Sequence, residues 1–166
     1  MEKKTILVVD NGEEIRETLT KILEREGYQV LSAQDGQSAL EILRESKINI
    51  IISDVAMPRM DGPKLLKAAK HLRPEVEVIL MTGHGKSELG MEALKEGAFD
   101  FIHKPFTKLA LTKTVKQALE KQSLAMEVNL LKDRIRDLVS ELMDLIGDGP
   151  VHQFNYSRSM GTHSTH

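Results

Sequence analysis

The sequence predicts a doubly wound α/β fold with a five-stranded parallel sheet and an extended C-terminal helix. Five short apolar or β-branched runs alternate with stretches in which apolar residues recur at helical spacing. The run at 48–53 is almost wholly apolar, as expected for a strand that is covered by helices on both faces. Glycine or proline turn signals separate neighbouring segments, which is typical of strand–helix–strand units with parallel strands.

The elements follow one another at close spacing. Strands are expected at 5–9, 28–32, 48–53, 76–81 and 99–103, where apolar and β-branched residues cluster. Helices are expected at 13–26, 38–45, 63–72 and 87–96, where leucine, isoleucine and alanine repeat every three or four residues. Turn dipeptides separate these segments at Glu26-Gly27, Asp35-Gly36, Arg73-Pro74 and Glu96-Gly97. A fifth helix is expected after Thr107, a favourable N-cap residue.

The bulk composition excludes several classes of protein. The chain has 166 residues, a net charge of −2 and only 4% aromatic residues, with no tryptophan. We therefore expect no direct contact with nucleic acid and no membrane binding. The absence of cysteine excludes disulfides, thiolate metal sites and cysteine nucleophiles. The apolar run near the N-terminus is too short for a signal peptide or a membrane span, so a cytoplasmic protein is expected.

Polar residues stand where the expected strands end. Asp10 and Asn11 follow the first strand, Asp54 the third, Thr82 the fourth and Lys104 the fifth. The carboxyl ends of parallel strands form the usual ligand site of such a sheet. Two carboxylates, a hydroxyl and an ammonium group at one edge suit a phosphoryl group that is held together with a divalent cation.

Three segments carry a family resemblance: IIISDVAMPRMDG, ILMTGHG and FDFIHKPF. In this order and spacing they resemble the receiver domain of two-component response regulators, a flavodoxin-like fold, over about residues 3–122. The residues of the second and third segments are most similar to those of receivers of the nitrogen-regulation activator type. The resemblance implies that Asp54 accepts a phosphoryl group from a histidine kinase or a phosphotransfer protein. It implies further that Thr82 and Lys104 bind the phosphoryl group and that Phe101 swings inward with Thr82 on activation.

The resemblance also implies a Mg²⁺ site formed by Asp10, Asp54 and the backbone carbonyl of Ala56. The sequence departs from the family at Asn11, because the first strand of a receiver usually ends in two adjacent acids. An Asn carbonyl can still coordinate Mg²⁺, but without charge, so we expect a weakened metal site. The histidines His71, His84 and His103 show no metal-ligand spacing and are interpreted as structural or solvated.

The C-terminal third predicts a coiled coil. No glycine or proline occurs between Lys108 and Ile146, so one helix of roughly 60 Å is expected. Its apolar residues alternate at spacings of four and three: Leu124, Val128, Leu131, Ile135, Leu138, Leu142 and Leu145. Branched residues at a with leucine at d favour a parallel two-stranded coil, hence a homodimer through 124–145. Val139 and Ile146 widen the stripe, which leaves a higher oligomer open.

The predicted organisation is a receiver domain at 1–122, a coiled-coil extension at 123–146 and a polar tail at 147–166. The tail has no periodicity and is interpreted as disordered, either native or vector-derived. No phosphate-binding G-x-x-x-x-G-K-[ST] loop and no helix-turn-helix pattern occurs. The chain is therefore either a stand-alone receiver or the regulatory part of a longer protein.

Several functional interpretations are open. The leading one is a phosphorylation-controlled switch, which phosphorylates and dephosphorylates itself and is not a turnover enzyme. The alternative is a pseudo-receiver, a dimerisation and protein-binding module that is insensitive to phosphate, and Asn11 favours it. A metal-dependent aspartyl phosphatase would carry a second acid where Ala56 stands. A flavin carrier would need a phosphate-binding loop after the first strand, which is missing.

Overall fold

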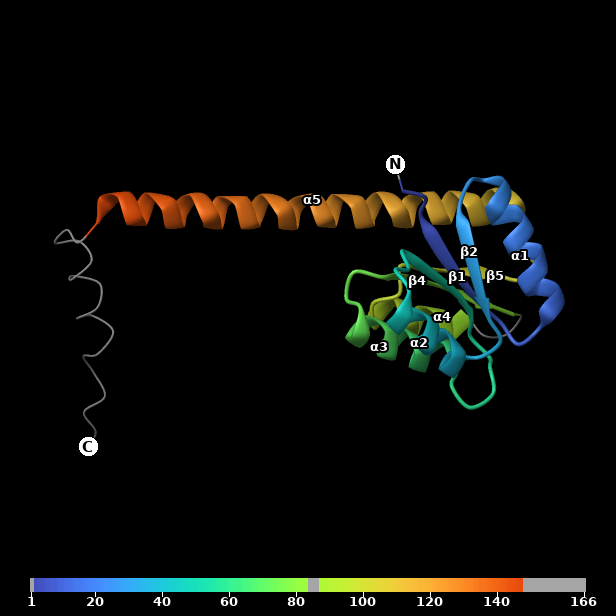
Figure 1. Cartoon of the computed structure of the whole chain (residues 1–166). Helices are drawn as coiled ribbons and strands as arrows, with labels where there is room; N and C mark the ends of the chain where they lie inside the picture. The colour runs from blue at the N-terminus through green and yellow to red at the C-terminus, as the bar shows by residue number, and fades with distance from the viewer. Residues whose placement is uncertain (1, 84–86, 148–166) are drawn as a thin grey trace, which may run out of the picture. The chain divides into compact units, whose positions relative to one another are not determined.

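The computed structural model describes residues 2–83 and 87–147. Within this part of the chain, five parallel strands form one sheet in the order β2-β1-β3-β4-β5. The strands are β1 (Thr5–Val9), β2 (Gln29–Ala33), β3 (Ile50–Asp54), β4 (Glu77–Thr82) and β5 (Asp100–His103). The helices are α1 (Glu13–Arg25), α2 (Gly36–Glu45), α3 (Gly62–Leu72), α4 (Ser87–Lys95) and α5 (Lys108–Ile146). The predicted fold class is confirmed (Figure 1).

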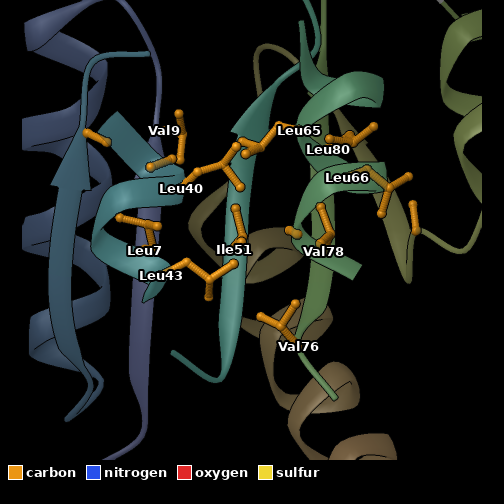
Figure 2. Close-up of a cluster of buried hydrophobic side chains, with 14 of the residues drawn as sticks. Leu7, Val9, Leu40, Leu43, Ile51, Leu65, Leu66, Val76, Val78 and Leu80 are labelled. Carbon is orange, nitrogen blue, oxygen red and sulfur yellow. The ribbon is translucent and has the colours of Figure 1, made fainter. Parts of the chain in front are cut away.

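Two buried apolar clusters cover the two faces of the sheet. One joins alternate strand residues to α2, α3 and α4, and Figure 2 shows its centre around Leu7, Ile51 and Val78. The other joins the intervening strand residues, among them Val8 and Ile52, to α1 and the first turns of α5. Because successive strand residues point to opposite faces, a strand buried on both sides must be apolar throughout. This requirement explains the apolar run that predicted β3.

The observed element bounds agree with the expected ones to within two residues, and those of β1 coincide. Asp54 is the last residue of β3 and Thr82 the last residue of β4, whereas both were expected just beyond their strands. The parallel ladder extends to them because Asp54 pairs with Met81 and Thr82 pairs with His103. Both side chains are therefore held by regular backbone pairing and not by a loop.

A buried polar network fastens α5 to the sheet at the opposite edge from these strand ends. The Gln122 amide nitrogen donates to the backbone carbonyls of Asn49 (2.9 Å) and Glu75 (2.8 Å). The Asn49 side chain donates to the Gln122 amide oxygen (3.2 Å) and accepts from the backbone N–H of Thr5 (2.9 Å). Beside it, the buried carboxylate of Glu77 pairs with Lys121 at 3.3 Å. Such closed networks satisfy every buried polar group and favour one position of the helix.

The chain divides into two compact units, Met1–Leu124 and Ala125–His166. The described part of the second unit is the C-terminal portion of α5, which runs without interruption to Ile146. The seven residues of its predicted a and d positions are all exposed, from 47% at Val128 to 82% at Leu145. No helix of the described residues is sufficiently long and apolar to cross a membrane.

Candidate functional site

Two carboxylates and one ammonium group converge at the carboxyl edge of the sheet. The Nζ atom of Lys104 lies 3.0 Å from Oδ2 of Asp10 and 3.3 Å from Oδ2 of Asp54. The Asp10 side chain is 4% exposed and that of Asp54 14%, so both acids lie in a poorly hydrated environment. Charge-assisted contacts of this kind are short and directional, and they compensate for the lost hydration of the two acids.

The Asp10 carboxylate is held in place by the turn that follows β1. Its Oδ1 accepts a hydrogen bond from the Gly12 backbone N–H at 2.8 Å, while Oδ2 faces Lys104. The Arg16 guanidinium, one turn into α1, donates to the Asp10 backbone carbonyl at 2.6 Å. Each oxygen of Asp10 therefore has its own partner, and the side chain is oriented before any ligand binds.

The Asp54 carboxylate stands at the end of β3, directly before the loop that leads to α3. Gly62, the first residue of α3, donates its N–H to the Val55 carbonyl at 2.9 Å. A Cβ atom at Gly62 would lie 2.7 Å from the Asp54 carbonyl oxygen, so only glycine permits this close approach. Ala56 is exposed, and its N–H lies 3.4 Å from Asp54 Oδ1. The Asp61 side chain accepts the Lys64 backbone N–H at 2.9 Å and caps α3.

Thr82 is fully buried at the end of β4, next to β5. Its hydroxyl lies 3.2 Å from Nδ1 of His103, and its carbonyl accepts the Lys104 backbone N–H at 2.7 Å. The structure thus connects Thr82 to β5 by both its side chain and its backbone. His103 is exposed, and its ring contacts Thr82, a partner that the interpretation as a structural or solvated residue did not specify.

Phe101 lies between α4 and the end of β5. Its ring is partly buried against the apolar cluster under α4, and a Cβ atom at Gly90 would approach its Cγ to 2.8 Å. Gly90 therefore provides the room that the ring occupies. The His103 ring meets the Phe101 ring edge to face, with centroids 5.2 Å apart and planes at 86°. This arrangement is a favoured geometry for aromatic pairs.

Asn11 is exposed and lines a surface hollow with Gln34, Asp35, Pro58 and Arg59. Within residues 2–83 and 87–147, no hydrogen bond to the Asn11 side chain is found, and no group of three or more metal-ligating side chains occurs. The two acids that are present do share one cation, Lys104, so their oxygens converge on one point. That donor set fits a hard divalent ion, with one carboxylate fewer than a three-acid site.

Asp35, across this hollow from Asn11, caps α2. Its carboxylate accepts the Ser38 N–H at 2.8 Å, and this hydrogen bond lowers the pKa of Asp35 below its ordinary value of 3.8. The nearby Arg59 guanidinium lowers this pKa further. The hollow beside Asn11 is therefore bordered by an acid that is ionised at neutral pH and by the Arg59 cation.

The sequence had singled out five strand-end residues, and the structure brings Asp10, Asp54 and Lys104 into direct contact. Thr82 is in the next strand and is linked to Lys104 through its backbone. Asn11 is exposed, and among the described residues its side chain makes no hydrogen bond to either acid. His84 lies outside the described residues. The contact of His103 with Thr82 was missed, although the two residues stand side by side once β4 and β5 are paired by their last residues.

Comparisons with known proteins agree with this geometry. The model of the response regulator receiver domain family matches residues 6–116. The nitrogen assimilation regulatory protein NtrX of Azorhizobium caulinodans is 40% identical over 129 residues, which are 76% of this chain and 28% of that protein. The chain spans about a third or less of the length of such curated relatives.

Solved structures show the same similarity. The crystal structure of NtrX from Brucella abortus with ADP has a TM-score of 0.75 and 36% identity, over 78% of this chain and 30% of that one. A receiver domain protein from Clostridium thermocellum has a TM-score of 0.71 and 33% identity, over 74% of this chain and 98% of that one. The second comparison shows that the fold of a whole isolated receiver is contained in this chain.

Proposed function

Because this chain belongs to the response regulator receiver domain family, we propose that it is a phosphorylation-controlled switch whose phosphoacceptor is Asp54. Receiver domains are signalling switches, and the match to their family model is the premise for this assignment. The observation that carries it is the contact of Lys104 with both Asp10 and Asp54 at the carboxyl edge of the sheet. A pair of largely shielded acids that shares one cation is suited to hold a phosphoryl group and its counter-ion.

The proposed reaction is an in-line phosphoryl transfer from a phosphohistidine of a histidine kinase or a phosphotransfer protein. A carboxylate oxygen of Asp54 attacks phosphorus, an O–P bond forms and the N–P bond breaks. The departing imidazole nitrogen takes up a proton from water. Lys104 is placed to neutralise charge on the phosphoryl oxygens, and Asp10 keeps the Lys104 ammonium oriented through its 3.0 Å contact.

A divalent cation of the Mg²⁺ type is supported by the donor set. The residues that would hold it are Asp10, Asp54, the amide oxygen of Asn11 and the carbonyl of Ala56. When bound, Mg²⁺ neutralises charge that develops on the transferred group. With Asn11 in place of an acid, one negative charge is missing from the set, so we propose weak binding in the resting chain. Glu13 and Glu14 are exposed in the first turn of α1, where their charges favour the positive N-terminal end of the helix dipole.

The proposed output runs through the end of β4 and β5. Thr82 would bind the phosphoryl oxygen that Lys104 leaves free, and Phe101 would move with it. The partly buried ring of Phe101 against Gly90 supports this coupling, because the ring position is the contact between β5 and α4. The charge that phosphorylation adds would in this way shift the equilibrium between two packing arrangements of the face formed by β4, β5 and α4.

We further propose that residues 124–145 form a homodimer through a parallel coiled coil. The support is a row of seven a and d residues that are each at least 47% exposed in the single chain. A helix that exposes such a continuous seam lacks the partner that would bury it. Glu127 at g and Lys132 at the following e position would pair across a parallel dimer. Val139 and Ile146 at e widen the seam, so a trimer or tetramer is a possible outcome of the measurement.

One observation favours a second function, a pseudo-receiver that dimerises without regard to phosphate. Asn11 is exposed, and within the described part of the chain two acids, and not three, meet at the strand ends. A site that bound no metal at all would be phosphorylated slowly or not at all. The presence of Asp54, Lys104 and Thr82 at neighbouring strand ends supports the switch instead.

The deciding experiment follows phosphate incorporation and molecular mass together. Wild type, Asp54→Ala and the control Asp137→Ala are incubated with acetyl phosphate and Mg²⁺, then analysed by intact mass spectrometry and by light scattering after size exclusion. The switch predicts one added phosphoryl group in wild type and in Asp137→Ala, and none in Asp54→Ala. A dimer that forms in all three without any incorporation would establish the pseudo-receiver.

A further inference from the structure

The hydroxyl of Thr82 is already engaged in the chain that carries no phosphoryl group. It lies 3.2 Å from His103 Nδ1, and the Thr82 side chain is fully buried. A hydroxyl has one proton to donate. If that proton is given to His103, it is not available to an oxygen of a phosphoryl group on Asp54. The imidazole and the phosphoryl group therefore compete for the same hydrogen.

The same imidazole also contacts Phe101, the second residue of the proposed output. The His103 and Phe101 rings meet edge to face at 5.2 Å, and Phe101 packs over Gly90 of α4. Meanwhile the Lys104 N–H holds the Thr82 carbonyl at 2.7 Å, and the strand ends stay paired. The side-chain bond can therefore break while the backbone pairing persists, which is what a reversible contact requires.

We propose that His103 is a positioning residue that holds the Thr82 hydroxyl against β5 in the resting chain and releases it when Asp54 carries a phosphoryl group. This inference rests on the proposed function. In it, His103 is the neutral Nε2–H tautomer, whose Nδ1 lone pair accepts the Thr82 proton. His103 thus opposes the phosphorylated state through one hydrogen bond. Removal of that bond should favour the phosphorylated state by about fivefold, the ratio that corresponds to one neutral hydrogen bond.

The test uses beryllofluoride, which binds a carboxylate non-covalently as a phosphoryl mimic, with Mg²⁺ and the full chain. Its dissociation constant is measured by calorimetry for wild type, His103→Leu and His103→Asn. The leucine cannot accept a hydrogen bond, whereas the asparagine amide oxygen can. We expect about fivefold tighter binding in His103→Leu and binding close to wild type in His103→Asn.

A double-mutant cycle separates positioning from mere packing. Thr82→Val keeps the side-chain shape but has no hydroxyl, so His103→Leu should then have no further effect on beryllofluoride affinity. Independently, ¹⁵N spectra of the neutral imidazole should show an unprotonated Nδ1 in the resting wild type. A protonated Nδ1 there would overturn the inference, since the ring would be donating to Thr82.

Failure of the inference about His103 can be distinguished from failure of the proposed phosphorylation switch. Equal or weaker beryllofluoride binding in His103→Leu than in wild type overturns the role of His103 and leaves the switch intact. The same gain in the Thr82→Val background also overturns it, because the gain would not pass through the hydroxyl. Wild type that binds no beryllofluoride with Mg²⁺ would refute the proposed function itself, and the inference with it.

Discussion

Replacing Asn11 by aspartate should tighten Mg²⁺ binding by about thirtyfold. The substitution adds one negative charge directly after Asp10, at an edge where Asp10 and Asp54 already share the Lys104 cation. A pair of unit charges 4 Å apart is worth about 1 kcal/mol in water and about 4 kcal/mol at an effective dielectric constant of 20. The Asn11 side chain is exposed, so the water value applies, and the double charge of Mg²⁺ brings it to about 2 kcal/mol.

Calorimetric titration with MgCl₂ is the suitable assay, because the chain contains no tryptophan whose fluorescence could report binding. Gln34→Glu is the matched control. Gln34 lines the same hollow as Asn11, so its substitution adds the same charge nearby without placing a carboxylate at the end of β1. We expect a gain in Asn11→Asp that clearly exceeds the gain in Gln34→Glu.

A second measurement on the same variant checks the sign of the effect. Without Mg²⁺, a third acid beside Asp10 and Asp54 adds repulsion that Lys104 alone must balance. Asn11→Asp should therefore unfold at a lower denaturant concentration than wild type in chelator, and regain stability as Mg²⁺ is added. Equal Mg²⁺ affinity in wild type and Asn11→Asp would refute the reasoning, and equal gains in Asn11→Asp and Gln34→Glu would show that ligation plays no part.

Three further predictions concern the scaffold. Leu131→Lys should convert the oligomer to monomer in sedimentation velocity. Leu130→Lys, which lies outside the a/d seam, should leave the oligomer intact. A monomeric wild type would contradict the proposed coiled coil. Gln122→Ala should lower the free energy of unfolding in urea by about 2–4 kcal/mol, because buried carbonyls lose their donor, whereas the exposed Gln117→Ala should change it by less than about 0.5 kcal/mol. Asp35→Ala should cost about 1 kcal/mol at pH 7 through loss of the α2 cap. Because the folded pKa of Asp35 is depressed, this difference should persist above its ordinary value of 3.8 and shrink as pH falls through the folded pKa.

Much of the fold was predictable because the strands carry a strong local signal. Runs such as 48–53 are apolar on both faces, and only a strand between two helical layers requires that. The strand ends were predicted only to within one or two residues. Backbone pairing determines where a parallel strand ends, and the hydrophobic run can end earlier. Asp54 and Thr82 show this, because each is polar and yet is the last paired residue of its strand.

The polar contacts were less predictable, because they join residues far apart in the chain. Gln122 meets Asn49 across 73 positions, and nothing near either residue indicates a buried amide pair. His103 was visible as a residue but not as a partner of Thr82. Its place follows from the register of β4 and β5, which the sequence does not state. The family motif had drawn attention to Lys104 and not to the residue before it.

The charge balance of the site indicates how Asn11, in place of an acid, affects Mg²⁺ binding before and after phosphoryl transfer. In the resting chain, Asp10 and Asp54 against Lys104 leave one net negative charge, which attracts a divalent cation only modestly. An aspartyl phosphate carries a charge of about −2, and with Asp10, Lys104 and Mg²⁺ the set then sums to about zero. With an acid at position 11 the same phosphorylated set would keep a negative charge. We therefore expect weak Mg²⁺ binding before transfer and tighter Mg²⁺ binding to the phosphorylated chain, which is a positive coupling between the phosphoryl group and the metal.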